Sequence, residues 1–383
     1  MVRAAIDVIE KTAHAVERRF TSKLHDERTA ALLGMGLGIT FTICFVTGLW
    51  SHLVQTPPSW FSRPPRPAGL YRVTQGLHIA TGIAMIPILL AKLWVVYPKL
   101  FAWPPFKSAA VAVERLALLP LIGGGLFLAF SGLANVNLWY PWPFGFKEAH
   151  YWAAWITIGA LIVHVGAKWT VTRSHVARRV PPDAGSGDRR AFLGTVAAAV
   201  SVVTVATVGQ TVGPLRKLAL LAPRRPDVGP QGFPVNRTAR AARVTVEDGG
   251  ATYRLTVTGR VARELSFSRA ELTGMDLHQA RLPIACVQGW SASANWRGVR
   301  VRDLLAMAGA AEGASVRIVS LQESGAFRSS VLQPDETRDG DTLLALEVNG
   351  EPLHIDHGYP LRLIGPNRPG VLQTKWVTGL VVE

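Results

Sequence analysis

The chain has 383 residues, of which 49% are hydrophobic and only 17% are charged, and its mean hydropathy is +0.22. Soluble domains carry about 25% charged residues, so this composition indicates that much of the chain does not lie in water. The formal net charge of +15 does not predict nucleic-acid binding, because residues 214–383 hold 21 basic and 17 acidic side chains. Most of the excess lies in short segments between apolar runs, and we expect no nucleic acid among the partners.

Five apolar stretches are long enough to cross a bilayer as helices, which takes about 20 residues each. The stretches are 30–53, 73–97, a segment within 116–146, 150–172 and 191–213. Lys92, near one end of the second stretch, can reach the membrane surface with its long side chain. Pro87 and Pro120 are tolerated in membrane helices. The first four stretches predict a membrane bundle over 29–175, and the fifth is typical of a signal anchor.

Basic residues predict how these spans are oriented. With the N-terminus in the cytoplasm, the segments on that side, which include residues 1–28 and the linker 176–190, hold 16 basic residues. The two opposite loops hold only four, which are Arg63, Arg66, Arg72 and Lys147. We therefore expect a multi-pass protein of the cytoplasmic membrane. Five spans would leave the C-terminal domain outside the cytoplasm.

A Pro/Gly/Asp-rich stretch at 181–190 ends in Arg189-Arg190, followed by Ala-Phe-Leu-Gly. A twin arginine before Phe-Leu and a mildly apolar helix resembles a twin-arginine export signal. Such a signal would indicate that the following domain is exported already folded around a cofactor. Alternatively, the two arginines only follow the positive-inside rule before an ordinary helix.

Beyond a second linker at 214–232, the apolar residues alternate as they do in half-buried strands. The predicted strands, separated by Gly, Pro and Asp turns, are 244–246, 253–257, 316–320, 342–348, 361–364 and 377–382. Residues 301–308 predict a short helix. We therefore expect residues 233–383 to form a mixed α+β, mostly β, domain.

Histidines within the apolar stretches are candidates for function, because ionisable residues are rare there. His150 and His164 are fourteen residues apart, so one helix would carry both on one face, separated by about 21 Å along its axis. His78 begins the second stretch at the depth of His150. Two facing histidines at one depth suit a six-coordinate haem iron. Alternatively, His150 is an interfacial residue and His164 is a polar contact between helices.

Two pieces, Gly76-Leu-His-Ile-Ala-Thr-Gly82 and His150-Tyr-Trp-Ala-Ala-Trp with Ile-Val-His164, resemble the b-type cytochrome subunits of formate dehydrogenases and nickel–iron hydrogenases. The similarity covers about residues 20–175. It implies that His78 and His150 bind an outer haem b and that His164 binds an inner one. As the partner of His164, the first stretch offers His25 at its inner edge or His52 at its outer end. A single haem is the alternative.

The two cysteines are Cys44, in an apolar stretch, and Cys286, in the polar half, and they form no disulfide framework. An unpaired cysteine in an exported domain is safe from oxidation when it is buried or bound to a metal. Cys286 is therefore either a structural thiol or a metal ligand. Nothing around it matches a cysteine-hydrolase signature, although His278, His354 and His357 could supply a base.

Residues 233–383 resemble the catalytic domain of the sulfite-oxidase-like molybdopterin oxidoreductases. Three segments carry the resemblance: Phe233-Pro-Val-Asn-Arg-Thr238, Cys286-Val-Gln-Gly-Trp290, and Asp356-His-Gly-Tyr-Pro-Leu-Arg-Leu-Ile-Gly-Pro366 with Lys375-Trp376. It implies that the Cys286 thiolate binds molybdenum. It also implies that Asn236, Arg362 and Lys375 hold the pterin and its phosphate, and that His357 and Tyr359 lie beside the same pocket. The Val-Gln-Gly-Trp after the cysteine is closer to the bacterial membrane-linked and protein-methionine-sulfoxide-reductase branch.

Together, these features predict an α-helical membrane bundle of four spans plus a fifth, followed by a sulfite-oxidase-like catalytic domain. The expected activity is oxo transfer on a small substrate or an oxidised protein side chain, in either direction. Electrons would pass through one or two b haems to or from quinone in the lipid bilayer. The alternative is a non-catalytic membrane electron-transfer or sensor protein with a vestigial molybdopterin domain.

Overall fold

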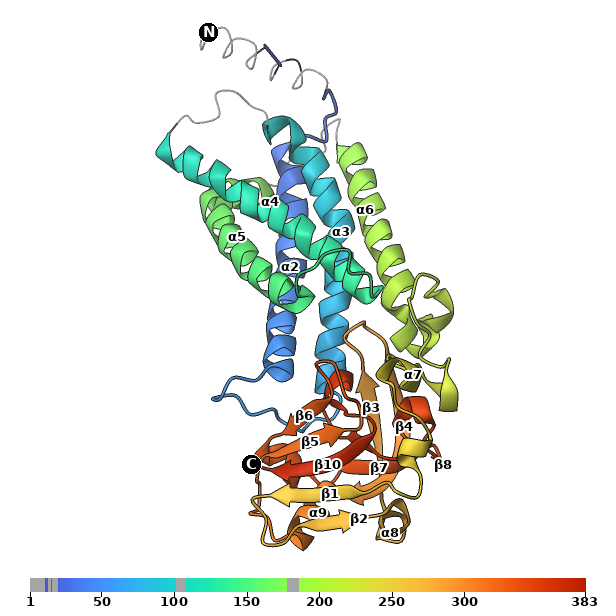
Figure 1. Ribbon diagram of the computed structural model, residues 1–383. Coiled ribbons are helices and arrows are strands. Elements are labelled where there is room, and N and C mark those ends of the chain that lie inside the picture. Colours follow the sequence, from blue (N-terminus) through green and yellow to red (C-terminus); the bar gives the residue numbers. More distant parts are fainter. Residues whose placement is uncertain (1–10, 13–14, 16–19, 101–107, 178–185) are drawn as a thin grey trace. The chain divides into compact units, whose positions relative to one another are not determined.

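The computed structural model describes residues 11–12, 15, 20–100, 108–177 and 186–383 (Figure 1). The predicted segments 1–28 and 176–190 therefore lie partly outside the described residues. The chain divides into two compact units, which are Met1–Val46 with Leu77–Thr207, and Thr47–Gly76 with Val208–Glu383. The second unit thus contains a stretch of the N-terminal half that was expected to belong to the membrane bundle.

Among the described residues, five helices are long and apolar enough to cross a membrane, as the apolar stretches predict. They are α2 (Glu27–Gln55), α3 (Leu70–Leu100), α4 (Ala109–Val136), α5 (Phe146–Ala177) and α6 (Ser186–Val208). Helix α6 begins five residues earlier than the predicted fifth span, because Asp188 in its first turn suits the positive end of the helix dipole. It also ends earlier, where the chain tightens into the 3-10 turns η1 (Gly209–Thr211) and η2 (Gly213–Leu218).

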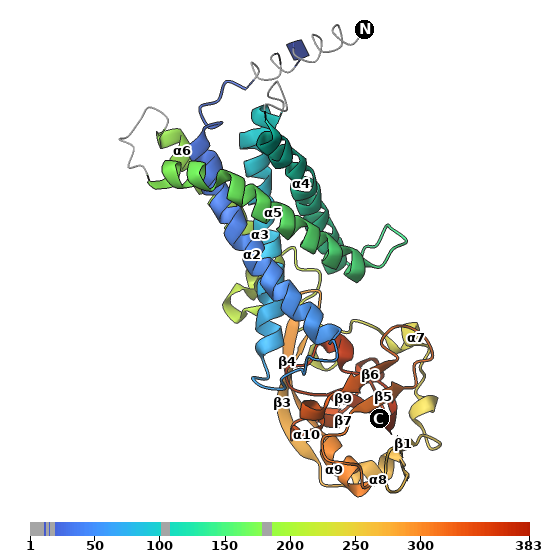
Figure 2. The same ribbon diagram turned by 90° about the vertical axis from the view of Figure 1, so that its left-hand side faces the viewer.

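The helices of the first unit pack through small apolar clusters and leave large apolar side chains exposed. Phe41, Met85 and Leu128 join α2, α3 and α4 in one cluster. Helices α4 and α5 lie side by side (Figure 2). On the outer faces, Leu119 is 71% exposed and Val202 is 69% exposed. Helices that are apolar on their exposed faces are typical of membrane spans.

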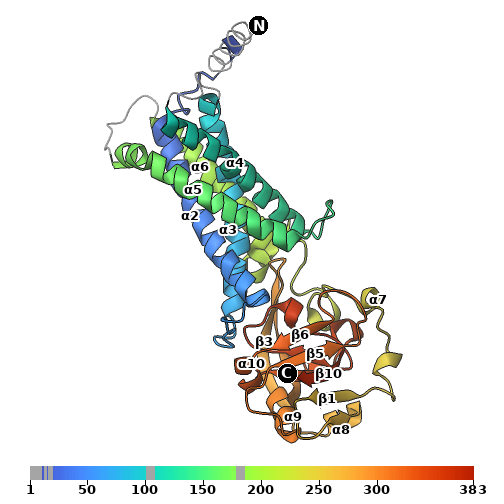
Figure 3. The same cartoon turned by 60° about the vertical axis from the view of Figure 1, so that its left-hand side comes forward.

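The second unit contains two sheets, one mixed and one antiparallel, built around a common core. The first sheet has the order β2-β1-β10-β5-β6, of which Figure 3 shows β6, β5, β10 and β1 in succession. Its strands are β1 (Leu255–Gly259), β2 (Leu265–Phe267), β5 (Val316–Ser320), β6 (Ser329–Leu332) and β10 (Val377–Val382). Strands β1 and β10 run parallel, with Thr256 opposite Gly379, and the other pairs of this sheet are antiparallel.

The second sheet has the order β3-β4-β7-β8, and β9 also pairs with β7. Its strands are β3 (His278–Ala285), β4 (Ser291–Arg300), β7 (Leu343–Val348), β8 (Glu351–Pro352) and β9 (Arg362–Ile364). Three short helices precede the first strand, and they are η3 (Pro230–Gly232), α7 (Ala239–Ala242) and η4 (Glu247–Gly249). The others lie between strands: α8 (Arg269–Thr273), α9 (Val301–Met307), α10 (Pro334–Arg338), η5 (Ile355–His357) and η6 (Gly370–Leu372). Side chains from both sheets, such as Val257, Leu380 and Leu363, are fully buried together.

The predicted strand at 244–246 is wrong, although its residues alternate as a strand would. Thr245 instead binds Asp248 through both its backbone N–H (2.7 Å) and its hydroxyl (3.0 Å), and Arg243 before it has a left-handed φ of 58°. Such local side-chain bonds compete with strand pairing. The other predicted strands overlap β1, β5, β7, β9 and β10. The predicted mostly β character of this domain is therefore confirmed.

Candidate functional site

Cys286 lies in a tight turn between β3 and β4. Its N–H donates to the carbonyl of Trp290 at 2.9 Å, and the N–H of Gly289 donates back to the Cys286 carbonyl at 3.1 Å. Gly289 has a φ of 94°, which a side chain would strain. The Cys286 residue is 3% exposed, and its Sγ donates to Gln288 Oε1 at 3.5 Å.

Burial raises the pKa of the Cys286 thiol to about 11, against the opposing effects of backbone N–H groups and of the Arg224 charge. The thiol therefore holds its proton at neutral pH in the protein alone. A bound metal stabilises the thiolate instead and releases the proton. A buried thiol of this kind differs from an exposed, low-pKa nucleophile and fits either a structural residue or a metal ligand.

Three of the predicted pterin-binding residues meet around Gly358. A Cβ on this glycine would lie 3.1 Å from the Cβ of Arg362 and 3.2 Å from the Cβ of Lys375, and its φ is +113°. His357 directly precedes it in η5. Glycine at this position thus allows two basic side chains and an imidazole to come together.

Arg362 is a buried cation whose charge no acidic side chain balances among the contacts of the described residues. It is 3% exposed, its Nη1 donates to the His357 carbonyl at 3.0 Å, and its Nε is buried without a partner. The guanidinium lies 5.4 Å from the ring centre of Trp296. Burial lowers the pKa of Arg362 to about 9, so it remains charged at neutral pH.

Lys375 and His357 lie beside Arg362, and we call these three residues the basic cluster. Lys375 Nζ donates to the carbonyls of Arg237 (2.6 Å) and Asp356 (2.8 Å), and its pKa is well below the usual value because of burial and the nearby Arg362 charge. Burial, aided by the Arg362 charge, lowers the pKa of His357 to about 3. His357 is therefore neutral and donates from Nε2 to the Pro230 carbonyl at 2.7 Å.

A buried cation with only carbonyl partners and an unpaired N–H is costly unless an anion balances it. Arg362 and Lys375 therefore fit a group that carries a phosphate. Asn236 is half-buried, and its Oδ1 accepts from the backbone N–H of Arg237 at 3.1 Å. It thus neighbours the cluster through Arg237, whose carbonyl binds Lys375. No hydrogen bond of the described residues joins Cys286 to the basic cluster directly.

Cys286 and the basic cluster instead share one hydrophobic cluster. Phe233, Trp296 and Cys286 all belong to it. The Phe233 ring stacks on His357 with ring centres 3.8 Å apart, and Trp296 lies against Arg362. Tyr359 packs against the same cluster, and its hydroxyl donates to the Gly249 carbonyl at 3.3 Å. Cys286, His357, Tyr359 and Arg362 thus belong to, or lie against, one apolar cluster.

In the helical unit, the structure brings His78 and His150 together. Their ring centres are 6.3 Å apart. The Nδ1 of His78 is 2.8 Å from the Cys44 carbonyl, and the Nδ1 of His150 is 2.9 Å from Ser131 Oγ. Such bonds through Nδ1 orient a ring and leave Nε2 as the metal-binding nitrogen. Because imidazole–metal bonds are about 2 Å long, two rings on one metal have centres roughly 6 Å apart.

The second predicted haem finds less support in the contacts of the described residues. His164 has a buried Nδ1 with no hydrogen-bond partner. His25 binds the Val95 carbonyl through Nδ1 at 3.0 Å and packs on Trp94 with ring centres 4.6 Å apart. No hydrogen bond or ring contact of the described residues joins His25 to His164.

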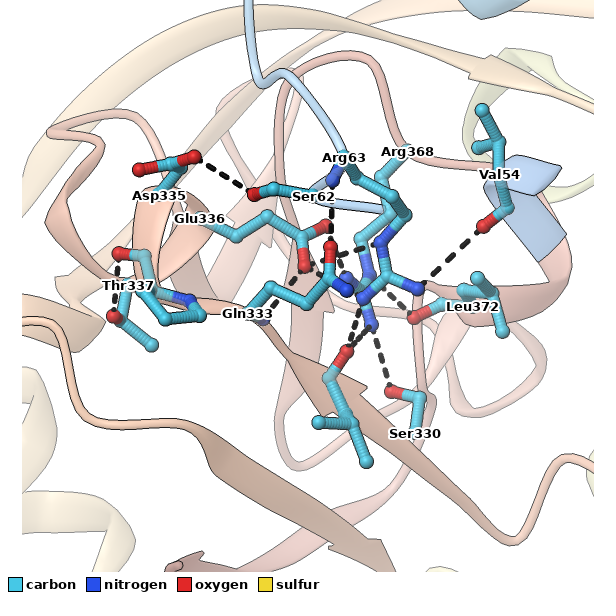
Figure 4. Close-up of polar contacts among 12 residues, drawn as sticks. Val54, Ser62, Arg63, Ser330, Gln333, Asp335, Glu336, Thr337, Arg368 and Leu372 are labelled. Atoms are coloured by element: carbon cyan, nitrogen blue, oxygen red, sulfur yellow. Dashed lines mark hydrogen bonds and ion pairs between the residues drawn. The ribbon is translucent and has the colours of Figure 1, made fainter. Parts of the chain in front are cut away.

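The sequence did not reveal the residues that bind the segment before α3 to the β domain. Arg63, counted only as a loop charge, is 4% exposed and donates to Glu336 at 2.6 Å. Arg368 binds the other oxygen of Glu336 at 2.5 Å and also donates to Ser330 (Figure 4). Arg63 further donates to the carbonyls of Val331 and Val54. The result is a buried Arg–Glu–Arg network.

Asn367 binds the same segment at three points. Its backbone N–H donates to the Ala68 carbonyl at 3.0 Å and its side-chain amide donates to the Pro64 carbonyl at 2.6 Å. Its Oδ1 accepts from the Tyr71 N–H at 2.6 Å. Asn367 is 4% exposed and has a left-handed φ of 50°, which asparagine tolerates better than most residues. Residues 64–71 are therefore an integral part of the second unit.

Several known proteins are similar to the C-terminal domain. Residues 241–383 match the family model of the oxidoreductase molybdopterin binding domain. The chain is 33% identical to the uncharacterized oxidoreductase YuiH of Bacillus subtilis over 33% of this chain and 64% of that protein. It is 30% identical to the mitochondrial sulfite oxidase of Drosophila melanogaster over 36% of this chain and 26% of that protein.

A further relative is a candidate protein-methionine-sulfoxide reductase subunit, YedZ1, of Azospira oryzae. The chain is 27% identical to it over 36% of this chain and 51% of that protein. The chain thus spans less than two thirds of the length of each of these relatives. The matches show that residues 241–383 are a molybdopterin-binding domain similar to that of sulfite oxidase.

Proposed function

Because the C-terminal domain is a sulfite-oxidase-like molybdopterin-binding domain, we propose that the chain is a membrane-bound molybdenum oxidoreductase. Its reaction is oxo transfer on a small substrate or an oxidised protein side chain, and it exchanges electrons with the quinone pool through b haem. The observation that carries the proposal is the buried Cys286 thiol, which shares a hydrophobic cluster with the side chains that pack on the basic cluster.

In this proposal, each residue of the domain has a defined part. Cys286 provides a soft thiolate for molybdenum, which supplies two-electron oxo transfer when it is bound. Arg362 and Lys375 hold the phosphate of the pterin, and Asn236 lies beside them. Neutral His357 is fixed by Pro230 and Phe233 and keeps the Arg362 side chain in place through its carbonyl. Trp296 and Phe233 exclude water from this region.

The direct test is elemental and cofactor analysis of the purified full chain. We expect about one molybdenum and one pterin per chain after expression in a host that makes the cofactor. A visible spectrum of the same sample should show reduced b-type haem. Protein that contains neither molybdenum nor pterin would refute the proposal for the C-terminal domain, whatever the haem spectrum shows.

In the helical unit, we propose that His78 and His150 bind one haem b. The His78→Ala/His150→Ala double variant should lose that haem, because both axial ligands are removed. The measurement is the reduced α-band and the haem content per chain. Thr42→Ala, which removes an α2 side chain that bonds the Gly38 carbonyl of its own helix, is the control and should keep full haem content. Normal haem in the double variant would refute the assignment.

If a second haem is present, we propose that His164 binds it, with His25 on the same side. His164→Ala should then remove one of two haems and leave the absorption of the other unchanged. A wild-type content of one haem per chain would leave His78 and His150 as the ligand pair and exclude the second site.

We further propose that the catalytic domain faces the extracytoplasmic side and is delivered there by Arg189-Arg190. In the structure, both arginines lie in the first turns of α6. Replacing both by lysine keeps the charge but should abolish recognition as a twin-arginine signal. The domain should then stay in the cytoplasm, protected from protease added to spheroplasts. Arg173→Lys is the control. Unchanged export of the double variant would show that the two arginines only follow the positive-inside rule.

A further inference from the structure

The turn that carries Cys286 is held from outside by the ends of two apolar helices. Val287, the residue after the cysteine, accepts a hydrogen bond on its carbonyl from Gln75 Nε2 at 3.1 Å. Ala285, the residue before it, packs in one cluster with Val54 and Tyr71. The residues on both sides of Cys286 therefore contact α2 or α3 at the end that belongs to the second unit.

The orientation of the Gln75 amide is fixed by its second partner. Ser51 Oγ donates to Gln75 Oε1 at 2.7 Å, so the Gln75 nitrogen must point to the Val287 carbonyl. Gln75 and Ser51 are each 5% exposed, so these bonds are largely shielded from solvent. A buried and fully oriented amide of this kind holds its acceptor in one position.

Tyr71 and Gln75 are four residues apart on α3, so they lie on the same helix face. Tyr71 is bound through its N–H to Asn367, and Pro369, two residues later, pairs with Ala285. The turn therefore lies between α3 and the segment of Asn367 and Pro369. Movement of α3 relative to this segment would displace the backbone next to the thiol.

We propose that Gln75 is a positioning residue for the molybdenum ligand Cys286, so that an apolar helix of the N-terminal half sets the geometry of the metal centre. This inference rests on the proposed function of Cys286. The residues that orient a metal ligand also tune the properties of the metal. Here the Gln75 hydrogen bond fixes the Val287 carbonyl and, through the adjoining peptide, the direction of the Cys286 side chain.

The test uses the full chain loaded with cofactor and needs no substrate. The Mo(V) state is generated by titration with dithionite and recorded by electron paramagnetic resonance. In Gln75→Leu, the donor to Val287 is lost while the side-chain size is nearly kept. We expect shifted g-values and a shifted midpoint potential, with unchanged molybdenum, pterin and haem contents. Gln55→Leu removes an amide that binds Ser51 and Tyr71 but not the turn, and it should give the wild-type signal.

Gln75→Glu provides a second variant that tests the hydrogen bond itself. A buried carboxylate that faces a carbonyl has a pKa raised above its ordinary value of about 4.3. Below that raised pKa the carboxyl group is protonated and can donate to Val287. The Mo(V) signal of this variant should therefore approach that of the wild type at low pH and depart from it at high pH. A merely structural disturbance would not be reversed by protonation.

The outcomes separate the two proposals. Wild-type protein without molybdenum refutes the proposed function and, with it, this inference. Wild-type protein with molybdenum, combined with wild-type signals in Gln75→Leu and pH-independent wild-type signals in Gln75→Glu, refutes the positioning role alone. If Gln75→Leu does not fold, as judged by loss of haem, the signals of Gln75→Glu and Ser51→Ala test the positioning role instead. Ser51→Ala frees the amide to rotate and should shift the signal in the same direction as Gln75→Leu.

Discussion

Glu336→Ala is expected to lower the free energy of unfolding of the C-terminal domain by about 3–5 kcal/mol, because it leaves two buried guanidinium groups without an anion. Arg63 and Arg368 are 4% and 2% exposed, and both bind this one carboxylate. Glu336 also caps α10 by accepting from the backbone N–H of Gln333 at 2.8 Å. The change therefore removes a helix cap and an ion-pair network together.

Chemical denaturation of the full chain, followed through the buried tryptophans of this domain, measures this loss. Glu347→Ala is the matched control, since its pair with Arg297 is partly exposed, with side-chain exposures of 22% and 48%. Exposed pairs contribute at most about 1 kcal/mol. Equal effects of the two substitutions would contradict the importance of the buried network.

The same network predicts a loss of stability in acid. Burial alone would raise the pKa of Glu336, but the charges of Arg368 and Arg63 outweigh it and hold the pKa below the ordinary value of 4.5. The folded protein thus binds this proton less readily than the unfolded chain. The stabilisation that ionised Glu336 gives the folded state is fully present above about pH 4.5. It declines as the pH falls from there through the lowered pKa of Glu336 in the folded protein. Glu336→Gln should flatten this part of the pH profile.

Cys286→Ser is expected to abolish oxo transfer while the pterin remains bound. The serine hydroxyl is a hard ligand with a far higher pKa than a thiol, so it does not replace the thiolate. The contacts proposed for the pterin, from Arg362 and Lys375, do not involve the sulfur. Substrate-driven reduction or oxidation of the haem should disappear with the activity, because electrons then have no source at the metal.

Pterin content, molybdenum content and haem redox kinetics measured on one preparation check this prediction. Cys44→Ser, which changes the other cysteine of the chain, is the control and should keep pterin and molybdenum contents at the wild-type level. Full turnover by Cys286→Ser would show that the thiol is a structural residue and would refute its role as a ligand.

The five apolar helices could be predicted because apolar runs of more than 20 residues with at most one charged residue have few alternatives. Strand β5 matches its predicted bounds, since Val316, Ile318 and Ser320 alternate regularly with less buried residues. Strands β3 and β4 were missed. Pro283 interrupts the alternation of β3, and β4 contains Gly, Asn and two arginines, which are weak strand signals.

Some residues of the candidate site could likewise be predicted from the sequence, and others could not. Cys286, Arg362, Lys375 and His357 were found because short local motifs carry the resemblance. Arg63 and Gln75 were not found, because each binds a partner more than 200 residues away in the sequence. Local periodicity contains no information on such pairs. Their burial is visible only after the chain has folded. In the sequence, an arginine in a loop between two apolar stretches is indistinguishable from an ordinary interfacial charge.

The buried arginine network also imposes an order of assembly. Arg63 and Glu336 are 273 residues apart in the chain, so Arg63 leaves the ribosome long before its partner exists. At about 5–20 residues per second, this delay is roughly 14 to 55 s. During this time the segment around Arg63 has no anion to bind, and the β domain cannot complete its core contacts. Formation of this network therefore closes a loop that encloses most of the chain.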